Sequence, residues 1–207
     1  WRRPAVDPLL SGKDPKLQVQ NNFRATPVMI GGVLYSPNGV GLVEAFDPGT
    51  GKTIWIQEPG AGPDALRGTS TRGVAYWRDA SDERIFVQRG ESLIALNAKT
   101  GQPYSTFGTA GAVSLHLASD KDPYSWSGAP RVCRDVVIVG ASMSDSPPRK
   151  EGTPGDVRGY DVRTGQLRWT FHVVPRGGEF GVDTWKDNSW QYTGHANLWS
   201  LISVDEQ

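Results

Sequence analysis

The chain has 207 residues, enough to bury one sizeable core, so its length alone excludes little. Its 25 glycines, 15 prolines and 8 tryptophans accompany only 37% hydrophobic residues, a composition that favours many short strands and turns over helices. The 22 basic and 22 acidic residues balance, and no basic run occurs, which argues against nucleic acid or an anionic membrane surface as a partner.

The two ends of the chain read as cuts in a longer protein. The sequence begins at Trp1 without Met, and its last residues, SLISVDEQ, are typical of a strand entering a turn. No apolar run between them approaches the roughly 20 residues that a membrane-spanning helix needs. The single cysteine, Cys133, cannot form an internal disulfide and lies in a strand-like stretch, where cysteine usually acts as a small apolar residue.

Three similar segments follow one another along the chain. They read AFDPGTGKTIW (45–55), ALNAKTGQPYSTF (95–107) and GYDVRTGQLRW (159–169), and their starts are 50 and then 64 residues apart. Each carries a small residue, then Asp or Asn, then Thr-Gly, and later an aromatic residue. This pattern predicts a β-hairpin whose Asp or Asn side chain accepts hydrogen bonds from amides just downstream: Asp47, Asn97 and Asp161. The glycines that close these turns are expected to take positive φ: Gly51, Gly101 and Gly165.

A further strand pair is expected upstream of each hairpin, in residues 26–38, 83–96 and 129–142, where branched apolar residues alternate around short turns. Two hairpins per repeat make a four-stranded blade. The sequence therefore predicts an all-β fold, a partial β-propeller of about three four-stranded antiparallel blades. The repeats lie near 23–60, 70–107 and 126–171, and a further blade starts near 195–207. Chance recurrence of a common turn is the alternative.

Two of the aromatic residues in these repeats are tryptophans, Trp55 and Trp169, and we expect them to pack between neighbouring blades. Burying one tryptophan contributes at most about 4 to 6 kcal/mol, more than any surface contact. The middle repeat has Phe107 in this role, displaced by two positions, so its junction is expected to be built differently.

The repeats resemble the tryptophan-docking motifs of the PQQ-dependent (quinoprotein) alcohol and sugar dehydrogenases, whose complete domains are eight-bladed propellers. The most specific stretches are residues 70–77, 93–115 and 157–190, and the last two are most similar to the glucose and quinate dehydrogenase branch. Many alcohol-oxidising relatives carry adjacent cysteines before the motif in 70–77. Leu66 and Arg67 stand there in this chain, which argues against the alcohol branch; the sugar-oxidising relatives place a His in this loop, where the nearest equivalent is Gly68.

The resemblance implies residues for the cofactor, pyrroloquinoline quinone (PQQ), and for a Ca²⁺ ion. Arg72 matches an arginine that contacts the cofactor, and its fork of donors suits carboxylates; pairing with a nearby Asp or a carbonyl is the alternative. Asp145 matches an acidic Ca²⁺ ligand, although it could simply close a turn before two prolines. Ser142 and Ser144, on the same strand exit, could donate to cofactor oxygens.

Two further cofactor residues lie near the end of the chain. Trp199 matches the residue whose indole forms the floor beneath the quinone plane; the alternative is one more tryptophan that packs between blades. Asn197, two residues earlier, is expected to hydrogen-bond the quinone. The three histidines share no metal-ligand spacing, and we assign them no catalytic or metal-binding role.

The function implied by the resemblance is oxidation of a sugar, polyol or alcohol hydroxyl by hydride transfer to the quinone, with electrons passed to ubiquinone or a cytochrome. The family's catalytic aspartate and basic residue would fall beyond Gln207, so this chain holds no catalytic residue and should be inactive and marginally stable alone. Family members of this type work in the periplasm, and membrane association would come from parts outside this chain. The alternative is a non-catalytic propeller scaffold of the outer-membrane assembly-factor type.

Overall fold

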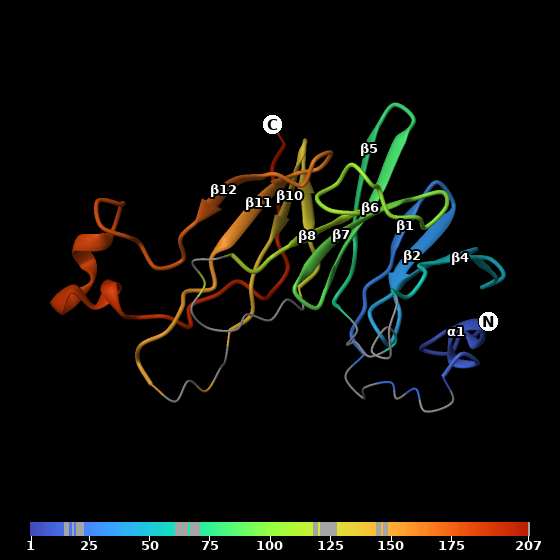
Figure 1. Cartoon of the computed structure of the whole chain (residues 1–207), viewed down its shortest axis with the longest axis horizontal. Coiled ribbons are helices and arrows are strands. Elements are labelled where there is room, and N and C mark those ends of the chain that lie inside the picture. Colours follow the sequence, from blue (N-terminus) through green and yellow to red (C-terminus); the bar gives the residue numbers. More distant parts are fainter. Residues whose placement is uncertain are drawn as a thin grey trace.

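The computed structural model describes residues 1–14, 17, 19, 23–60, 66, 71–117, 120, 128–143, 146 and 149–206. Its strands form three separate four-stranded sheets, each antiparallel and each with its strands in chain order. The three sheets lie side by side in chain order, with the first sheet nearest the N-terminus and the third sheet farthest from the N-terminus (Figure 1). This arrangement confirms the all-β fold and its four-stranded antiparallel units.

The elements have the following bounds. A short helix α1 (Pro8–Ser11) precedes the first sheet, which comprises β1 (Val28–Ile30), β2 (Val33–Pro37), β3 (Val43–Phe46) and β4 (Thr53–Ile56). The second sheet comprises β5 (Ala75–Asp79), β6 (Asp82–Arg89), β7 (Ser92–Asn97) and β8 (Ala112–Ser114). The third sheet comprises β9 (Arg131–Cys133), β10 (Val136–Val139), β11 (Val157–Asp161) and β12 (Leu167–Phe171), and two 3₁₀ helices follow, η1 (Val182–Thr184) and η2 (Lys186–Gln191). None of the helices in these ranges is long and apolar enough to cross a membrane.

The Thr-Gly turns have the predicted local structure. Oδ1 of Asp47 accepts hydrogen bonds from the Thr50 amide at 2.7 Å and the Thr50 hydroxyl at 2.8 Å. The equivalent oxygens of Asn97 and Asp161 accept from amides two and three residues downstream. The three glycines that close the turns have φ values of 71°, 73° and 75°.

The second sheet departs from the expected strand pairing. Residues 83–96 were expected to form the upstream pair, but they supply the second and third strands, β6 and β7, and the first strand is β5. The fourth strand, β8, does not follow the Asn97 turn directly and begins only at Ala112. In the intervening segment Phe107 is fully buried, so this junction is built differently, as its displaced position predicted.

The core lies between the sheets. Ile85 and Val87 of β6 pack with the first sheet, whereas Phe86 between them packs with the third. Successive side chains of a strand point to opposite faces, so a sheet covered on both faces needs apolar residues at consecutive positions. The run from Ile85 to Val87 meets this need, and all three side chains are fully buried.

Tryptophans pack on the Thr-Gly turns of the first and second sheets. Nε1 of Trp55 donates to the Ala98 carbonyl at 2.9 Å, and a Cβ atom at Gly101 would stand 2.8 Å from Cδ2 of the same indole. Trp1 repeats the contact on the first sheet: Nε1 donates to the Pro48 carbonyl at 2.8 Å, and a Cβ at Gly51 would stand 2.7 Å from its Cδ2. The packing expected for Trp55 is confirmed, and Trp1 is a second example that the repeats did not predict.

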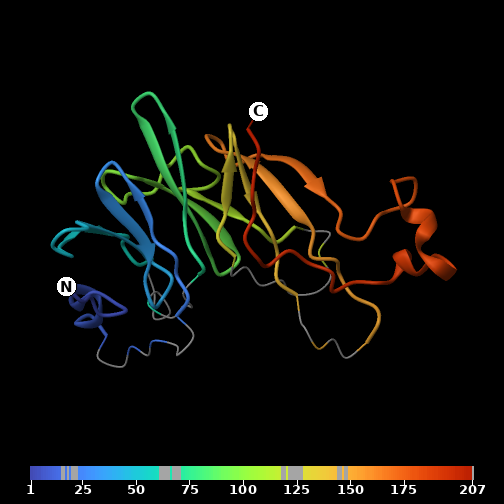
Figure 2. The same cartoon turned by 180° about the vertical axis from the view of Figure 1, so that it is seen from behind.

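The last strand of the third sheet, β12, is more exposed than the last strand of the first sheet, β4. Trp169 occupies the position in β12 that Trp55 occupies in β4, opposite a small residue of the neighbouring strand. It remains 39% exposed, with Leu167 and Phe171 of the same strand at 43% and 62%. Beyond β12, residues 172–195 extend away from the sheets, and the chain then returns to run beside the β9–β10 hairpin (Figure 2).

Candidate functional site

Arg72 and Trp199 meet at one end of the second sheet. Arg72 lies three residues before β5, and its carbonyl accepts the Thr26 amide at 2.8 Å, which ties it to the entry of the first sheet. Its Cζ lies 4.6 Å from the centroid of the Trp199 ring, a cation–π contact. Its Nε is buried and finds no hydrogen-bond partner within the described part of the chain. The two residues that the family resemblance selected therefore touch, although the sequence separates them widely.

Asn197 lies close to the strand exit that follows β10. The Gly155 amide donates to the Ala196 carbonyl at 2.7 Å, and Gly155 and Asn197 form a parallel bridge. A Cβ at Gly155 would stand 2.6 Å from Cβ of Asn197 and 2.9 Å from Cγ of Met143, so these three residues are in close contact. Nδ2 of Asn197 donates to the His195 carbonyl at 3.0 Å, whereas its buried Oδ1 has no partner among the residues placed by the structure.

The serines and the acidic residue of the same strand exit are only partly described. Ser142 is half-buried between Ala141 and Met143, both buried in the core between the second and third sheets. Ser144 and Asp145 lie outside the described residues. Within the described ranges no group of three or more His, Cys, Asp or Glu residues is placed to hold a metal ion.

Gln88 is a polar residue near this site that the sequence did not select. It belongs to β6, is fully buried, and both polar atoms of its amide lack a hydrogen-bond partner among the described residues. A Cβ at Gly128 would stand 3.8 Å from Oε1 of Gln88 and 3.6 Å from the carbonyl oxygen of Trp199. The available signal was one amide directly after the apolar run IFV, which alone does not distinguish a ligand contact from a satisfied core residue.

A small cavity adjoins Arg72. Its volume is about 120 Å³, and its lining includes Thr26 and Val28 of the first sheet, Ala129 and Pro130 before the third, and Leu201 and Ile202 from the returning chain. All three sheets therefore contribute to this end, which is also where the segments preceding β1, β5 and β9 enter their sheets.

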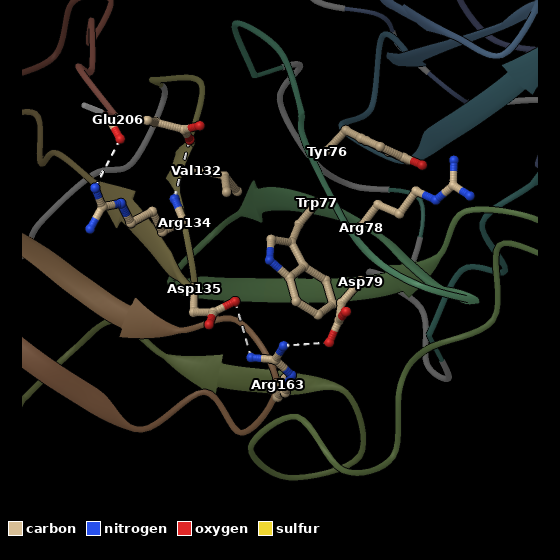
Figure 3. A pocket seen from close by; sticks show the side chains of 9 residues that line it. All are labelled: Tyr76, Trp77, Arg78, Asp79, Val132, Arg134, Asp135, Arg163 and Glu206. Atoms are coloured by element: carbon tan, nitrogen blue, oxygen red, sulfur yellow. Dashed lines mark hydrogen bonds and ion pairs between the residues drawn. The ribbon is translucent and has the colours of Figure 1, made fainter.

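A larger cavity of about 430 Å³ lies at the opposite end of β5, where Asp79 is the last residue. Figure 3 shows Arg163 between two carboxylates, Asp79 at 2.7 Å and Asp135 at 3.1 Å. The guanidinium also lies over Trp77, 4.6 Å from the ring centroid. The hydrogen bond to Asp79 raises the pKa of Arg163. Since its charges pair with one another, this cavity reads as an ionic junction between the second and third sheets.

The end that carries Arg72 has the chemistry of a site for a flat anionic ligand. A guanidinium and two buried amides offer hydrogen bonds, and an indole offers a stacking surface. Arg72 covers one face of that indole, so a ring stacked on Trp199 would use the other face or displace the guanidinium. These groups fit a quinone with several carboxylates, and the described residues leave the metal ligand open.

Comparison with known proteins agrees with this architecture. The chain is 30% identical over 200 residues to the quinohemoprotein alcohol dehydrogenase ADH IIB of Pseudomonas putida, covering 89% of this chain and 26% of that protein. It is 30% identical over 175 residues to quinoprotein glucose dehydrogenase A of Acinetobacter calcoaceticus, covering 72% and 21%. The crystal structure of the quinohemoprotein alcohol dehydrogenase from Comamonas testosteroni matches with a TM-score of 0.67 and 26% identity, over 91% of this chain and 28% of that one.

The chain thus spans about a quarter of the length of these relatives, in keeping with a partial propeller. Alcohol and glucose dehydrogenases match with the same identity, so the branch remains a proposal. Residues 3–207 match the family model described as the PQQ glucose/ethanol/alcohol dehydrogenase β-propeller domain, and the chain belongs to this family.

Proposed function

We propose that this chain is the part of a PQQ-dependent dehydrogenase that contacts the quinone through Arg72, Trp199 and Asn197. The observation that supports this most directly is the contact of the Arg72 guanidinium with the Trp199 ring, at the end of the sheets where buried amides lack partners. A structural protein gains nothing from leaving such groups unsatisfied, because each one costs free energy in the absence of a ligand or water.

Each residue has a separate task in this proposal. Arg72 donates to carboxylate oxygens, for which the planar guanidinium supplies two parallel hydrogen bonds. Trp199 stacks on the quinone plane and excludes water from one face. Ser142 and Ser144 donate to the remaining oxygens, as does the second hydrogen on Nδ2 of Asn197, whose first donates to the His195 carbonyl. Asp145 serves as an oxygen ligand for Ca²⁺.

The reaction of the whole protein is the oxidation of a sugar, polyol or alcohol hydroxyl. When bound, PQQ supplies a carbonyl group that accepts the hydride of the substrate. The base that removes the hydroxyl proton and the basic residue beside the quinone are assigned to sequence beyond Gln207, so this chain alone is expected to be inactive. We assign the glucose and quinate branch, a periplasmic location, and ubiquinone or a cytochrome as electron acceptor on the family resemblance.

The role of Arg72 is tested by binding rather than by turnover. In the full-length gene product, Arg72→Ala should weaken PQQ binding about 10- to 150-fold, the range for losing about 1.5–3 kcal/mol from a hydrogen bond to a charged group. The PQQ affinity of Arg72→Lys should lie between those of the parent and of Arg72→Ala, because lysine keeps the positive charge and loses the pair of parallel donors. Quenching of tryptophan fluorescence by added PQQ gives the dissociation constants.

A matched control is Arg78→Ala. Arg78 lies in β5, is exposed, and donates from Nε to the Ala80 carbonyl at 3.2 Å, at the end of the strand away from Arg72. Its loss should leave PQQ affinity unchanged. Dye-linked oxidation of glucose, quinate and simple alcohols, with and without PQQ and Ca²⁺, then identifies the branch. Absence of PQQ binding and of activity in the parent would refute the proposal and favour a propeller scaffold.

A further inference from the structure

Gln88 faces the third sheet from the buried end of β6, one residue before the last. Its neighbours on the same face of β6 are Phe86, in the core shared with the third sheet, and Arg84, whose guanidinium donates to the Val162 and Arg163 carbonyls at 3.0 and 2.8 Å. Alternate residues of a strand share a face, so Gln88 points the same way. This orientation places its amide in the junction between the second and third sheets.

The amide lies at the level of Arg72 along that junction. Ala75 of β5 pairs with Phe86, so the strand register puts Gln88 beside Gly73, the residue that follows Arg72. At this level the two sheets approach closely, since a Cβ at Gly73 would stand 3.2 Å from Cβ of Ala129. The Gly128 position lies within 4 Å of both Oε1 of Gln88 and the carbonyl oxygen of Trp199, so both belong to the same end of this junction.

The two other buried residues with a side-chain amide in the described part of the chain, Gln57 and Asn38, form hydrogen bonds within the fold. Oε1 of Gln57 accepts the Val43 amide at 3.0 Å, and the Asn38 side chain accepts from Val40 and Leu42 while donating to Glu44. Gln88 is more deeply buried than either, and neither of its polar atoms has a partner in the described part of the chain. A buried amide in this state destabilises the fold unless a ligand or an ordered water fills its hydrogen bonds.

We infer that Gln88 is a further ligand contact of the site: its Nε2 donates to a carboxylate or carbonyl oxygen of the bound quinone from the side of the third sheet. This inference rests on the proposed function. It extends the donor set from Arg72, at the first and second sheets, and Asn197, in the returning chain, to the wall formed by the second and third sheets. An anionic ligand would then be held from three directions.

The inference predicts opposite effects on stability and on binding. Replacing Gln88 by leucine removes an amide that has no partner among the residues the structure describes, so the melting temperature without quinone should stay the same or rise. The same change removes one donor to the ligand, so PQQ affinity should fall about tenfold, equivalent to about 1.4 kcal/mol. The stabilisation produced by added PQQ should shrink accordingly.

Gln57→Leu is the matched control, because it removes a buried amide that is satisfied within the fold. In the full-length gene product, it should lower the melting temperature and leave PQQ affinity at the parental value. Gln88→Met, which keeps the side-chain length, serves as the second variant should the leucine protein fail to fold. Differential scanning fluorimetry without ligand and quenching of tryptophan fluorescence by PQQ supply the two readouts.

The outcomes separate the two claims. If the parent binds PQQ but Gln88→Leu and Gln88→Met bind it equally well and melt lower without it, as Gln57→Leu does, then Gln88 is a structural amide bridged by water and the inference is wrong. If the parent does not bind PQQ, the proposed function fails and the inference fails with it. Weaker binding together with an undiminished melting temperature supports the inference.

Discussion

Gly101→Ala should destabilise the protein more than an alanine placed at another glycine with the same backbone conformation. Gly101 has φ of 73° and closes the Asn97 turn, and the Trp55 indole packs against the space where a Cβ would lie. Gly32, in the turn between β1 and β2, has φ of 79°, but nothing lies within 4 Å of its Cβ position. The pair therefore separates the cost of positive φ from the cost of disturbing the tryptophan contact.

The two costs can be estimated. An L side chain in the left-handed region costs about 1–2 kcal/mol, which both variants incur. Forcing an extra carbon into a packed contact costs about 1–3 kcal/mol more, which only Gly101→Ala incurs. The free energy of unfolding should thus fall by about 1–2 kcal/mol for Gly32→Ala and about 2–5 kcal/mol for Gly101→Ala.

The assay is urea denaturation of the full-length gene product, followed by tryptophan fluorescence, with the slope m compared between variants so that a change in midpoint reports stability. Equal losses for the two variants would mean that the indole moves aside without cost, and the reasoning about the tryptophan contact would be refuted.

Two further predictions concern single hydrogen-bonded groups. Asp161→Ala should cost about 1–2 kcal/mol of unfolding free energy, because Oδ1 accepts the Thr164 amide at 2.9 Å and the Thr164 hydroxyl at 3.0 Å, while Asp161→Asn should cost little; equal losses in urea denaturation would argue against a role of this oxygen. The Tyr76 hydroxyl donates to Oε2 of Glu83 at 2.7 Å, which holds the pKa of Glu83 below its ordinary 4.5, while burial and then this bond raise the pKa of Tyr76 to about 12. Stability from Glu83 is present above pH 4.5 and lost as pH falls through the lowered pKa, so the melting temperatures of Tyr76→Phe and the parent should differ at neutral pH and converge in acid; a difference that persists in acid would contradict this.

The local features of the fold were predictable from the sequence because few residues determine them. A Thr-Gly turn needs only a side-chain oxygen, a nearby amide and a glycine at positive φ, and all three occur within five residues of Asp47. The choice of strand partners was less predictable. Residues 83–96 do form a hairpin, but only the pairing of Ala75 with Phe86 shows that another strand precedes it.

The candidate site depended on contacts between distant parts of the chain. Hydrophobic periodicity says nothing about whether Arg72 meets Trp199; the family resemblance selected both, and the structure brings them to 4.6 Å. Gln88 escaped notice because an amide in an apolar strand is ordinary until its partners are counted in three dimensions. Trp1 was missed because it lies outside the three Thr-Gly segments, and no Asp, Thr or Gly of that motif stands directly before it.

The tryptophan contacts give the row of sheets a direction. Trp55 reaches from the first sheet to the turn of the second, and Trp1, which precedes the first sheet, packs in the same way on the turn of the first, so both contacts run in chain order. Trp1 packs against Gly51 in the turn of the first sheet, whereas the indole of Trp169 in the third sheet is exposed. A sheet added beyond the third in the same way would place its turn against the exposed indole of Trp169.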